Sequence, residues 1–196
     1  MYEDNVTDSA WLIADRINEL LMTRGRITVG IDGRCAAGKT TLAAELSRIT
    51  GAAVVHADHF FLRPEQRTDE RYSEAGGNLD RERLLEEVLA PISRGERVAY
   101  RPFDCRTGTL GEVITLPDSR VVIVEGSYSL HPDLRNYYDL KIFLTVQKDE
   151  EVKRIIEREG NERAQNFFNR WIPLEEAYFS ALSPKECSDI VLGGER

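Results

Sequence analysis

The sequence predicts an α/β fold in which a parallel sheet of about five strands is flanked by helices on both faces. Short apolar runs, typical of buried strands, alternate along the chain with segments whose apolar residues recur at helical spacing. One strand and helix enclose a glycine-containing loop at residues 33–40. Carboxylates directly follow several apolar runs, at the strand ends where such sheets gather their ligands. These three observations predict the P-loop NTPase fold.

The elements follow one another in regular order. The first helix is expected to begin at a cap formed by Asp8 or Ser9 and to run to about Arg24. The predicted sheet strands are the apolar runs at residues 27–32, 52–57, 121–124, 140–146 and 189–192. Helices are predicted at residues 41–49, after a cap at residue 80, at 149–159 and from about residue 173.

The whole chain, residues 1–196, is predicted to form one domain with two small insertions. Residues 63–80 are polar and charged and predict a mobile loop over a site. Residues 97–118 read as two strands around a glycine-containing loop, in the manner of a hairpin. Residues 149–170 carry a series of arginines and are expected to form a lid.

Composition narrows the class of protein. Acidic residues outnumber basic ones by 34 to 26, giving a net charge of -8, which argues against broad nucleic-acid binding. The three cysteines are widely spaced and predict neither a disulfide framework nor a zinc cluster. No apolar run approaches the length of a membrane span, so we expect a cytoplasmic protein without membrane partners. Homo-oligomer formation is left open.

The loop at residues 33–40 matches the pattern G-x-x-x-x-G-K-[ST] at every fixed position. Its glycines allow close approach of the backbone, so that N–H groups converge on phosphate oxygens beside the positive end of the next helix. Lys39 is placed to reach the β- and γ-phosphates, and the Thr40 hydroxyl to ligate Mg²⁺. The predicted ATP-binding residues are Gly33, Arg34, Cys35, Ala36, Ala37, Gly38, Lys39, Thr40 and Thr41.

Three carboxylates fall at predicted strand ends. Glu125 follows an entirely apolar strand and is the candidate Mg²⁺ ligand, directly or through water, the alternative being a strand-end acid in solvent. Asp58 lies one strand away and could accept a proton from an attacking hydroxyl, or instead cap the following turn. Asp32 could brace the loop or hold a magnesium-bound water.

A series of arginines favours a kinase over the other classes of protein that contain this phosphate-binding loop. Arg154 and Arg158 share a helix face and could close over a triphosphate, with Arg163 and Arg170 following. The alternative is a solvated helix in which neighbouring glutamates pair with these arginines. The chain lacks the guanine-reading sequence Asn-Lys-x-Asp and the transporter signature Leu-Ser-Gly-Gly, which disfavours a GTPase and a transporter ATPase.

These features together resemble the uridine kinase and phosphoribulokinase family over roughly residues 27–160. The matching pieces are the loop at 33–40, Asp58-His-Phe-Phe, Val124-Glu125-Gly126, Phe103-Asp104 and the helix with Arg154, Arg158 and Gly160. The resemblance implies transfer of the γ-phosphoryl group of ATP, with Mg²⁺, to a hydroxyl of a small metabolite.

The resemblance also implies roles for individual residues. Asp58 would be the base, Lys39, Arg154 and Arg158 would neutralise charge on the transferring group, and Thr40 and Glu125 would hold the metal. The implied acceptor contacts are Phe61 and Phe103 beside the acceptor, and Asp80 or Asp104 on its sugar hydroxyls.

The sequence leaves several alternatives for the molecule that accepts the phosphoryl group. A nucleoside, uridine or cytidine, is favoured. The segment after Phe103, Cys105-Arg-Thr-Gly-Thr-Leu-Gly, departs from the family pattern. Arg63, Arg67 and Arg71 could contact a phosphate, so another hydroxylated metabolite, pantothenate or a sugar phosphate, is kept as an alternative acceptor. The third alternative is a nucleotide-binding regulator without catalysis.

Overall fold

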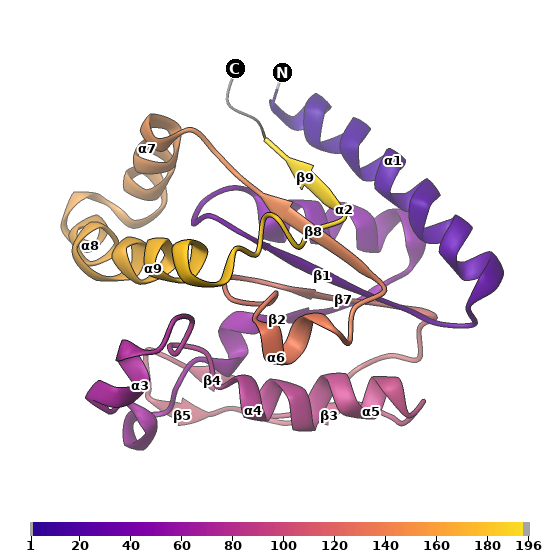
Figure 1. The fold of residues 1–196 in the computed structure, drawn as a ribbon, viewed down its shortest axis with the longest axis horizontal. Helices are drawn as coiled ribbons and strands as arrows, with labels where there is room; N and C mark the ends of the chain where they lie inside the picture. The colour runs from indigo at the N-terminus through magenta and orange to yellow at the C-terminus, as the bar shows by residue number, and fades with distance from the viewer. Residues whose placement is uncertain (1, 194–196) are drawn as a thin grey trace.

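The centre of the molecule is a five-stranded parallel sheet, as the sequence predicts (Figure 1). The structure is a computed structural model that describes residues 2–193, with side chains from residue 6 onward. Its strands, in spatial order, are β2 (Ala53–His56), β7 (Val121–Glu125), β1 (Ile27–Gly33), β8 (Leu140–Leu144) and β9 (Ile190–Leu192). Every neighbouring pair in the sheet runs parallel.

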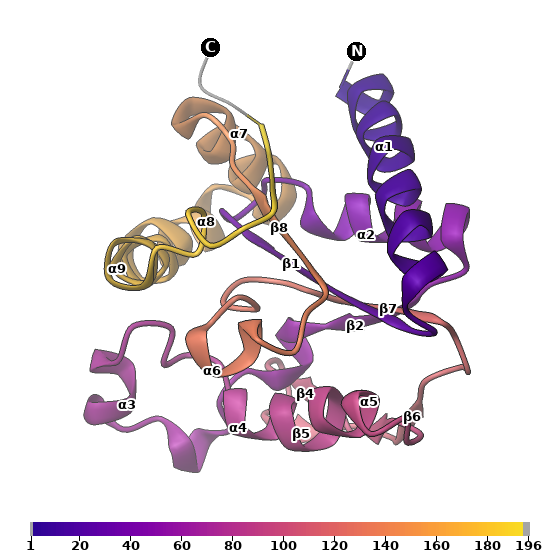
Figure 2. The same cartoon turned by 45° about the vertical axis from the view of Figure 1, so that its right-hand side comes forward.

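Helices cover both faces of this sheet and its carboxyl end (Figures 1 and 2). The longer helices are α1 (Tyr2–Thr23), α2 (Lys39–Thr50), α7 (Lys148–Glu159) and α9 (Ile172–Leu182). Shorter ones are α3 (Asp69–Ser73), α4 (Arg81–Leu84), α5 (Ala90–Ser93), α6 (Pro132–Arg135) and α8 (Asn161–Asn166). One-turn segments are η1 (Ala57–Phe60), η2 (Pro64–Gln66), η3 (Leu85–Leu89) and η4 (Phe167–Trp171).

Alternate side chains of the central strands supply two hydrophobic cores. In β7, Val121 and Ile123 belong to the core under α1 and α2, whereas Val122 and Val124 belong to the core under the α4–η3–α5 helix. Because both faces of the strand are buried, the run is apolar throughout. This burial explains why a strand without alternation could be recognised from the sequence.

Helix α1 begins earlier than the sequence predicted. It starts at Tyr2, so Asp8 and Ser9 lie inside the helix and do not cap it. The physical reason is that Val6 packs against the core formed with α2 and the sheet, which continues the apolar face one turn toward the N-terminus. The predicted end of the helix, near Arg24, agrees with the observed end at Thr23.

The two insertions form the lower layer in Figure 1. The second contains two short antiparallel pairs, β3 (Ala99–Tyr100) with β6 (Ile114–Thr115) and β4 (Phe103–Asp104) with β5 (Thr109–Leu110). The predicted hairpin is therefore confirmed, with an extra pair at its tip. The first insertion is not an irregular loop, since η2 and α3 form within it.

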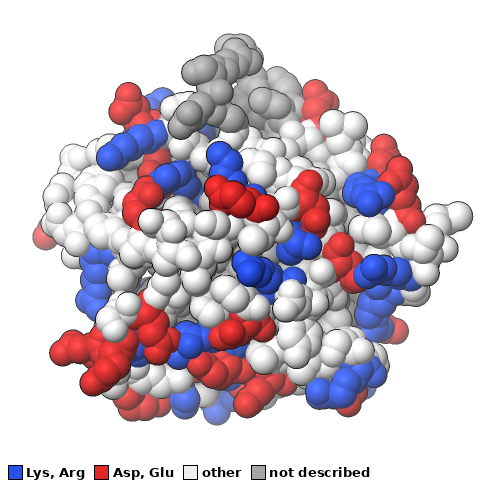
Figure 3. Space-filling view, in the orientation of Figure 1, with Lys and Arg blue, Asp and Glu red and all other residues white. Residues whose placement is uncertain are grey.

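Two observations describe the surface and the helices as a whole. No helix within residues 2–193 is both long and apolar enough to cross a membrane. On the face shown in Figure 3, acidic and basic side chains lie interspersed. Ion pairs of the described chain include Arg71 with Glu82, and Arg81 with Glu74 and Asp133.

Candidate active site

A large cleft opens at the carboxyl ends of the central strands, where the chain leaves β1, β2 and β7. It encloses about 850 Å³ and is lined by the loop after β1, the segment after β7, the first insertion and helices α7 to α9. In Figure 1, helices α7 to α9 lie above α3 on the left of the view. The cleft therefore brings together segments that are far apart in the sequence.

Glycine permits the close approach of the strand ends that shape the cleft. Gly33 has φ of 139°, and a Cβ there would lie 2.0 Å from the carbonyl oxygen of Leu144. Gly126 has φ of 141°, and a Cβ there would lie 2.7 Å from the Cβ of Ala57. Neither position can hold a side chain without moving a neighbouring strand end. The second contact sets Glu125 beside the segment that carries Asp58.

The phosphate-binding loop (P-loop, residues 33–40) leads directly into α2. Gly38 adopts a left-handed conformation at the N-terminus of this helix, and no side chain of the described chain caps it. Its N–H groups and the helix dipole are thus available to an anion. The Lys39 ammonium curls over the loop, donating to the carbonyl oxygens of Gly33 at 2.7 Å and Arg34 at 2.9 Å.

Glu125 and Thr40 form the candidate metal site. The Thr40 hydroxyl lies 3.2 Å from both carboxylate oxygens of Glu125, which is 4% exposed. His56 Nδ1 lies 2.6 Å from one of the same oxygens, and this hydrogen bond raises the pKa of His56. A hydroxyl and a carboxylate are the hard oxygen donors that Mg²⁺ prefers. The pair would therefore fit Mg²⁺, which would supply positive charge beside the P-loop.

Asp58 lies in η1 and lines the same cleft. Its side chain is open to solvent on the cleft side, but the surrounding protein removes enough water to raise the pKa of its carboxyl. Lys39 acts against this shift, and the Glu125 carboxylate adds to it. A carboxylate with a raised pKa is a stronger base than an ordinary aspartate. Asp58 is thus suited to accept a proton.

Both predicted lid arginines reach the P-loop from α7. Arg154 Nη1 donates to the carbonyl oxygen of Ala36 at 3.1 Å, and Arg158 Nη2 lies 3.7 Å from the sulfur of Cys35. Glutamates hold the other edges of these guanidinium groups, as the surface-helix alternative expected. The lid prediction and the surface-helix alternative are therefore compatible, because each arginine pairs with a glutamate and also lines the cleft.

The predicted acceptor contacts divide into one residue in the cleft and three outside it. Phe61 lines the cleft. Phe103 is 3% exposed and lies beneath the Arg67 guanidinium, whose carbon is 5.7 Å from the ring centroid. Asp104 pairs with Arg106 at the tip of the second insertion. For Phe103 and Asp104, contact with an acceptor stays a prediction.

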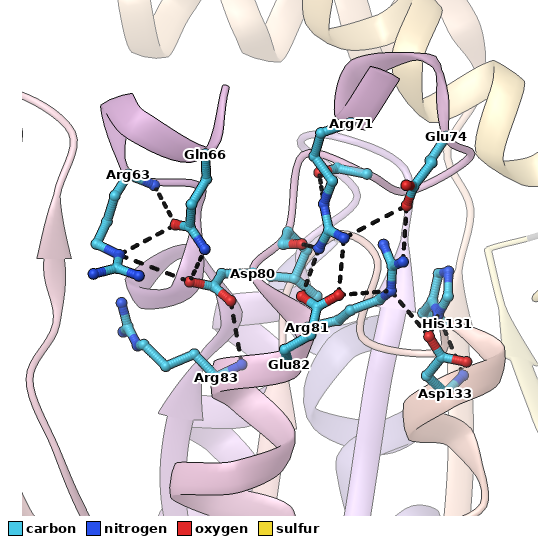
Figure 4. A network of polar contacts seen from close by, with 12 residues as sticks. Arg63, Gln66, Arg71, Glu74, Asp80, Arg81, Glu82, Arg83, His131 and Asp133 are labelled. Carbon is cyan, nitrogen blue, oxygen red and sulfur yellow. Dashed lines mark hydrogen bonds and ion pairs between the residues drawn. The ribbon is translucent and has the colours of Figure 1, made fainter. Parts of the chain in front are cut away.

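Asp80 is held inside a polar network that supports the first insertion (Figure 4). It is 2% exposed, caps α4 through the N–H of Arg83, and accepts from Gln66 Nε2 at 2.8 Å. The cap agrees with the sequence, while a contact with sugar hydroxyls stays a prediction that would require this network to open. The neighbouring Arg71 bonds Glu82 and two backbone carbonyl groups. Arg71 is therefore committed to holding the insertion.

Asp32 is a brace beneath the P-loop. Its buried carboxylate accepts hydrogen bonds from the backbone N–H groups of Gly33, Tyr128 and Leu130, and from the Tyr178 hydroxyl at 2.7 Å. These four contacts favour the structural one of its two predicted roles. They tie the start of the P-loop to the segment after β7 and to α9.

The sequence did not single out Ser127, Glu175 and Trp171, all of which line the cleft. Glu175 of α9 accepts from the Cys35 N–H at 3.0 Å and from the Ser127 hydroxyl at 2.5 Å. Helix α9 and η4 belong to a segment rich in aromatic residues. The one signal available beforehand was an acidic pair, Glu175 and Glu176, within an otherwise apolar helix.

A second, smaller cavity of about 250 Å³ adjoins the P-loop on the side of α1. Ala37, Gly38 and Arg154 line both cavities. The walls are otherwise mainly apolar and include Val6 of α1 and Val146 after β8. Its position beside the start of α2 makes it a candidate site for the base of a nucleotide.

Replacing Glu151 with Gln is expected to stabilise the protein at pH 8 but not at pH 4.5. Burial raises the pKa of Glu151 from 4.5 to about 7, and its Oε1 has no partner among the described residues. As pH rises through this window, the unfolded chain loses a proton that the folded chain retains, so the wild type becomes less stable. We expect a difference of about 1–3 kcal/mol above pH 7, measured by urea denaturation.

The matched control is Glu157→Gln, an exposed residue of the same helix, which should change stability little at either pH. A Glu151→Gln variant that is less stable than the wild type at pH 8 would contradict the argument.

The fold and the cleft define a kinase of the P-loop class. Residues 28–168 match the model of the Phosphoribulokinase / Uridine kinase family. The chain belongs to this family, as the resemblance in its sequence indicated.

Known proteins are similar over most of the chain. It is 31% identical over 154 residues to a uridine kinase of Ureaplasma parvum, covering 74% of each sequence. It is 25% identical over 183 residues to a uridine kinase of Chlamydia pneumoniae, covering 85% of this chain and 81% of the relative. The solved structure of a possible uridine kinase from Bacillus stearothermophilus is similar in fold, with a TM-score of 0.72 and 23% identity over 98% of this chain and 100% of that one.

Proposed function

We propose that the protein transfers the γ-phosphoryl group of Mg-ATP to a hydroxyl of a nucleoside, uridine or cytidine. The observation that carries the proposal is that Lys39, Thr40 and Glu125 line one cleft with Asp58. Triphosphate-binding groups and a candidate base thus face a common space. The similarity to uridine kinases supports a nucleoside as the acceptor.

The donor end of the cleft would hold ATP. P-loop N–H groups and Lys39 would bind the phosphates, and the smaller cavity beside α1 would take the base. Mg²⁺, held by Thr40 and Glu125, would neutralise charge on the terminal phosphates. Arg154 and Arg158 add positive charge where the transferring group moves, and their helix limits access of water.

The acceptor end would hold the nucleoside against Asp58. Phe61, Tyr72 and Trp171 supply aromatic surface there, and the Asn78 amide supplies a donor and an acceptor. The Asp58 carboxylate takes the proton of the acceptor hydroxyl while the oxygen of that hydroxyl forms a bond to the γ-phosphorus. The bond between that phosphorus and the ADP oxygen breaks at the same time, so positioning and charge neutralisation are the main contributions.

One observation favours a second candidate, an acceptor that already carries a phosphate. Arg67 and Arg170 line the acceptor end, and the described residues supply no carboxylate partner to either. Arg170 instead lies between the rings of Tyr72 and Trp171, at 4.9 and 4.7 Å from their centroids. Of the arginines expected for this role, Arg67 faces the cleft, whereas Arg71 is paired elsewhere. A sugar phosphate would suit these two guanidinium groups, because its phosphate would supply the anionic partner that they lack among the described residues.

The test is release of ADP from Mg-ATP, measured with and without uridine and cytidine, and then with pantothenate and sugar phosphates. We expect release to rise at least about 100-fold with a true acceptor, because the bound hydroxyl replaces a poorly positioned water. A uridine-dependent signal supports the nucleoside proposal. A signal only with a phosphorylated alcohol would replace it with the second candidate. Binding of ATP without any active acceptor would favour a regulator.

A further inference from the structure

Helix α9 is attached to the P-loop by three separate contacts. Glu175 accepts from the Cys35 N–H, Glu176 forms an ion pair with the Arg34 guanidinium, and Tyr178 donates to Asp32. All three partners lie at or directly before the P-loop. The helix that closes one side of the cleft is therefore fixed to the loop that would bind the triphosphate.

The Glu175 contact differs in kind from the other two. Glu175 is 6% exposed, and both its carboxylate oxygens accept hydrogen bonds from groups that line the phosphate cleft. The Ser127 hydroxyl, which donates to one oxygen, lies 3.4 Å from the Lys39 ammonium. Lys39 is the residue that reaches the terminal phosphates in loops of this pattern. A negative charge thus sits beside the place where the γ-phosphate would arrive.

Two anions cannot share this position without cost, because like charges repel and the Glu175 carboxylate is buried. A phosphate would also compete with the carboxylate for the same donors. Glu176 gives no such conflict, since its partner is the Arg34 side chain, which does not line the cleft. The conflict is specific to Glu175.

We propose that Glu175 is an internal competitor of the terminal phosphates, and that triphosphate binding releases the contact between α9 and the P-loop. The inference rests on the proposed triphosphate site. A ligand can shift a conformation only by binding one state better than the other, and displacement of Glu175 supplies that difference. Since η4 runs directly into α9, Arg170 and Trp171 move with it. Donor binding is thereby coupled to the acceptor end of the cleft.

The first test compares Glu175→Gln with Glu176→Gln in binding of Mg-ATP and Mg-ADP by calorimetry. Glutamine keeps one acceptor oxygen for the Cys35 N–H and can donate its amide N–H to the Ser127 hydroxyl, but it removes the charge. We expect Glu175→Gln to bind ATP about 10-fold more tightly than wild type, with a smaller gain for ADP, because repulsion is greatest at the γ-phosphate. Glu176→Gln should stay within about 2-fold, as an exposed pair contributes little.

The direction of the change in ATP affinity distinguishes this proposal from a purely structural role of Glu175. If Glu175 only holds the loop in shape, its replacement weakens ATP binding, and that result or an unchanged affinity overturns the proposal. Wild-type protein that binds no Mg-ATP would instead refute the proposed function, so the two failures are distinguishable.

The second test follows the movement itself. The chain has two tryptophans, so Trp11→Phe leaves Trp171 as the only one. Inorganic triphosphate with Mg²⁺ is the probe, because it has no base that could stack on the indole. We expect the probe to shift the Trp171 emission in this background, and the added Glu175→Gln substitution to reproduce part of that shift without the probe. Saturating binding with no change in emission would overturn the coupling.

Discussion

Replacing Asp58 with Asn is expected to lower turnover by about 10²–10⁴-fold while ATP affinity changes less than about 3-fold, since general-base catalysis contributes on that scale. The amide has nearly the same shape but cannot accept the proton of the acceptor hydroxyl. Asp58 also lies outside the P-loop, so the triphosphate contacts remain. Initial rates and calorimetric ATP binding measure the two quantities separately.

The pH dependence gives the same prediction a second readout. Because desolvation raises the pKa of Asp58, kcat/KM of the wild type should fall as pH drops through that raised pKa, as the carboxylate becomes protonated. In Asp58→Asn this acidic limb should disappear from the residual rate. The control is Asp118→Asn, a surface carboxylate 91% exposed that pairs with Arg26. Wild-type turnover in Asp58→Asn would remove Asp58 from the mechanism.

Replacing Lys39 with Ala should weaken triphosphate binding and turnover together. The ammonium is held over the centre of the P-loop by the Gly33 and Arg34 carbonyl oxygens, where it would meet the terminal phosphates. Its charge acts on the bound triphosphate and more strongly on the transition state. We expect ATP affinity to fall at least about 10-fold and kcat/KM about 10²–10⁴-fold.

Lys153→Ala is the matched control for this variant. Lys153 lies on α7 with a side chain 62% exposed and pairs with Glu150, so its loss should leave both quantities within about 2-fold. The expectation for Lys39→Ala fails if turnover falls while ATP affinity is unchanged, since the lysine would then not contact the bound triphosphate. Thermal unfolding of both variants would show whether the loop itself has been disturbed.

Several parts of the fold were accessible from local sequence. The run at 121–124 is apolar because both its faces are buried, and the P-loop pattern is contiguous, so each could be recognised without its neighbours. The start of α1 was missed because it depends on Val6 packing against a distant helix. The capping preference of Asp8 or Ser9 had less influence on the start of the helix than the packing of Val6.

The candidate site likewise contains residues that the sequence indicated and contacts that only the structure shows. The order of residues indicated Lys39, Thr40 and Glu125, because strand ends in a parallel sheet meet at one edge. It could not reveal that Asp80 also accepts a hydrogen bond from Gln66, nor that Arg71 forms an ion pair with Glu82, because these partners depend on how the insertion folds.

The sequence by itself determined the fold class, the P-loop and the family, since these reside in contiguous patterns and in the regular alternation of strands and helices. Only the tertiary structure decided that α9 reaches back to the P-loop, so that Glu175 meets the Cys35 N–H across 140 residues of chain. The physical reason is that the donor is a backbone N–H, which every residue except proline has, and the acceptor is one of many carboxylates. No sequence pattern therefore marks this pair. Packing alone selects the pair.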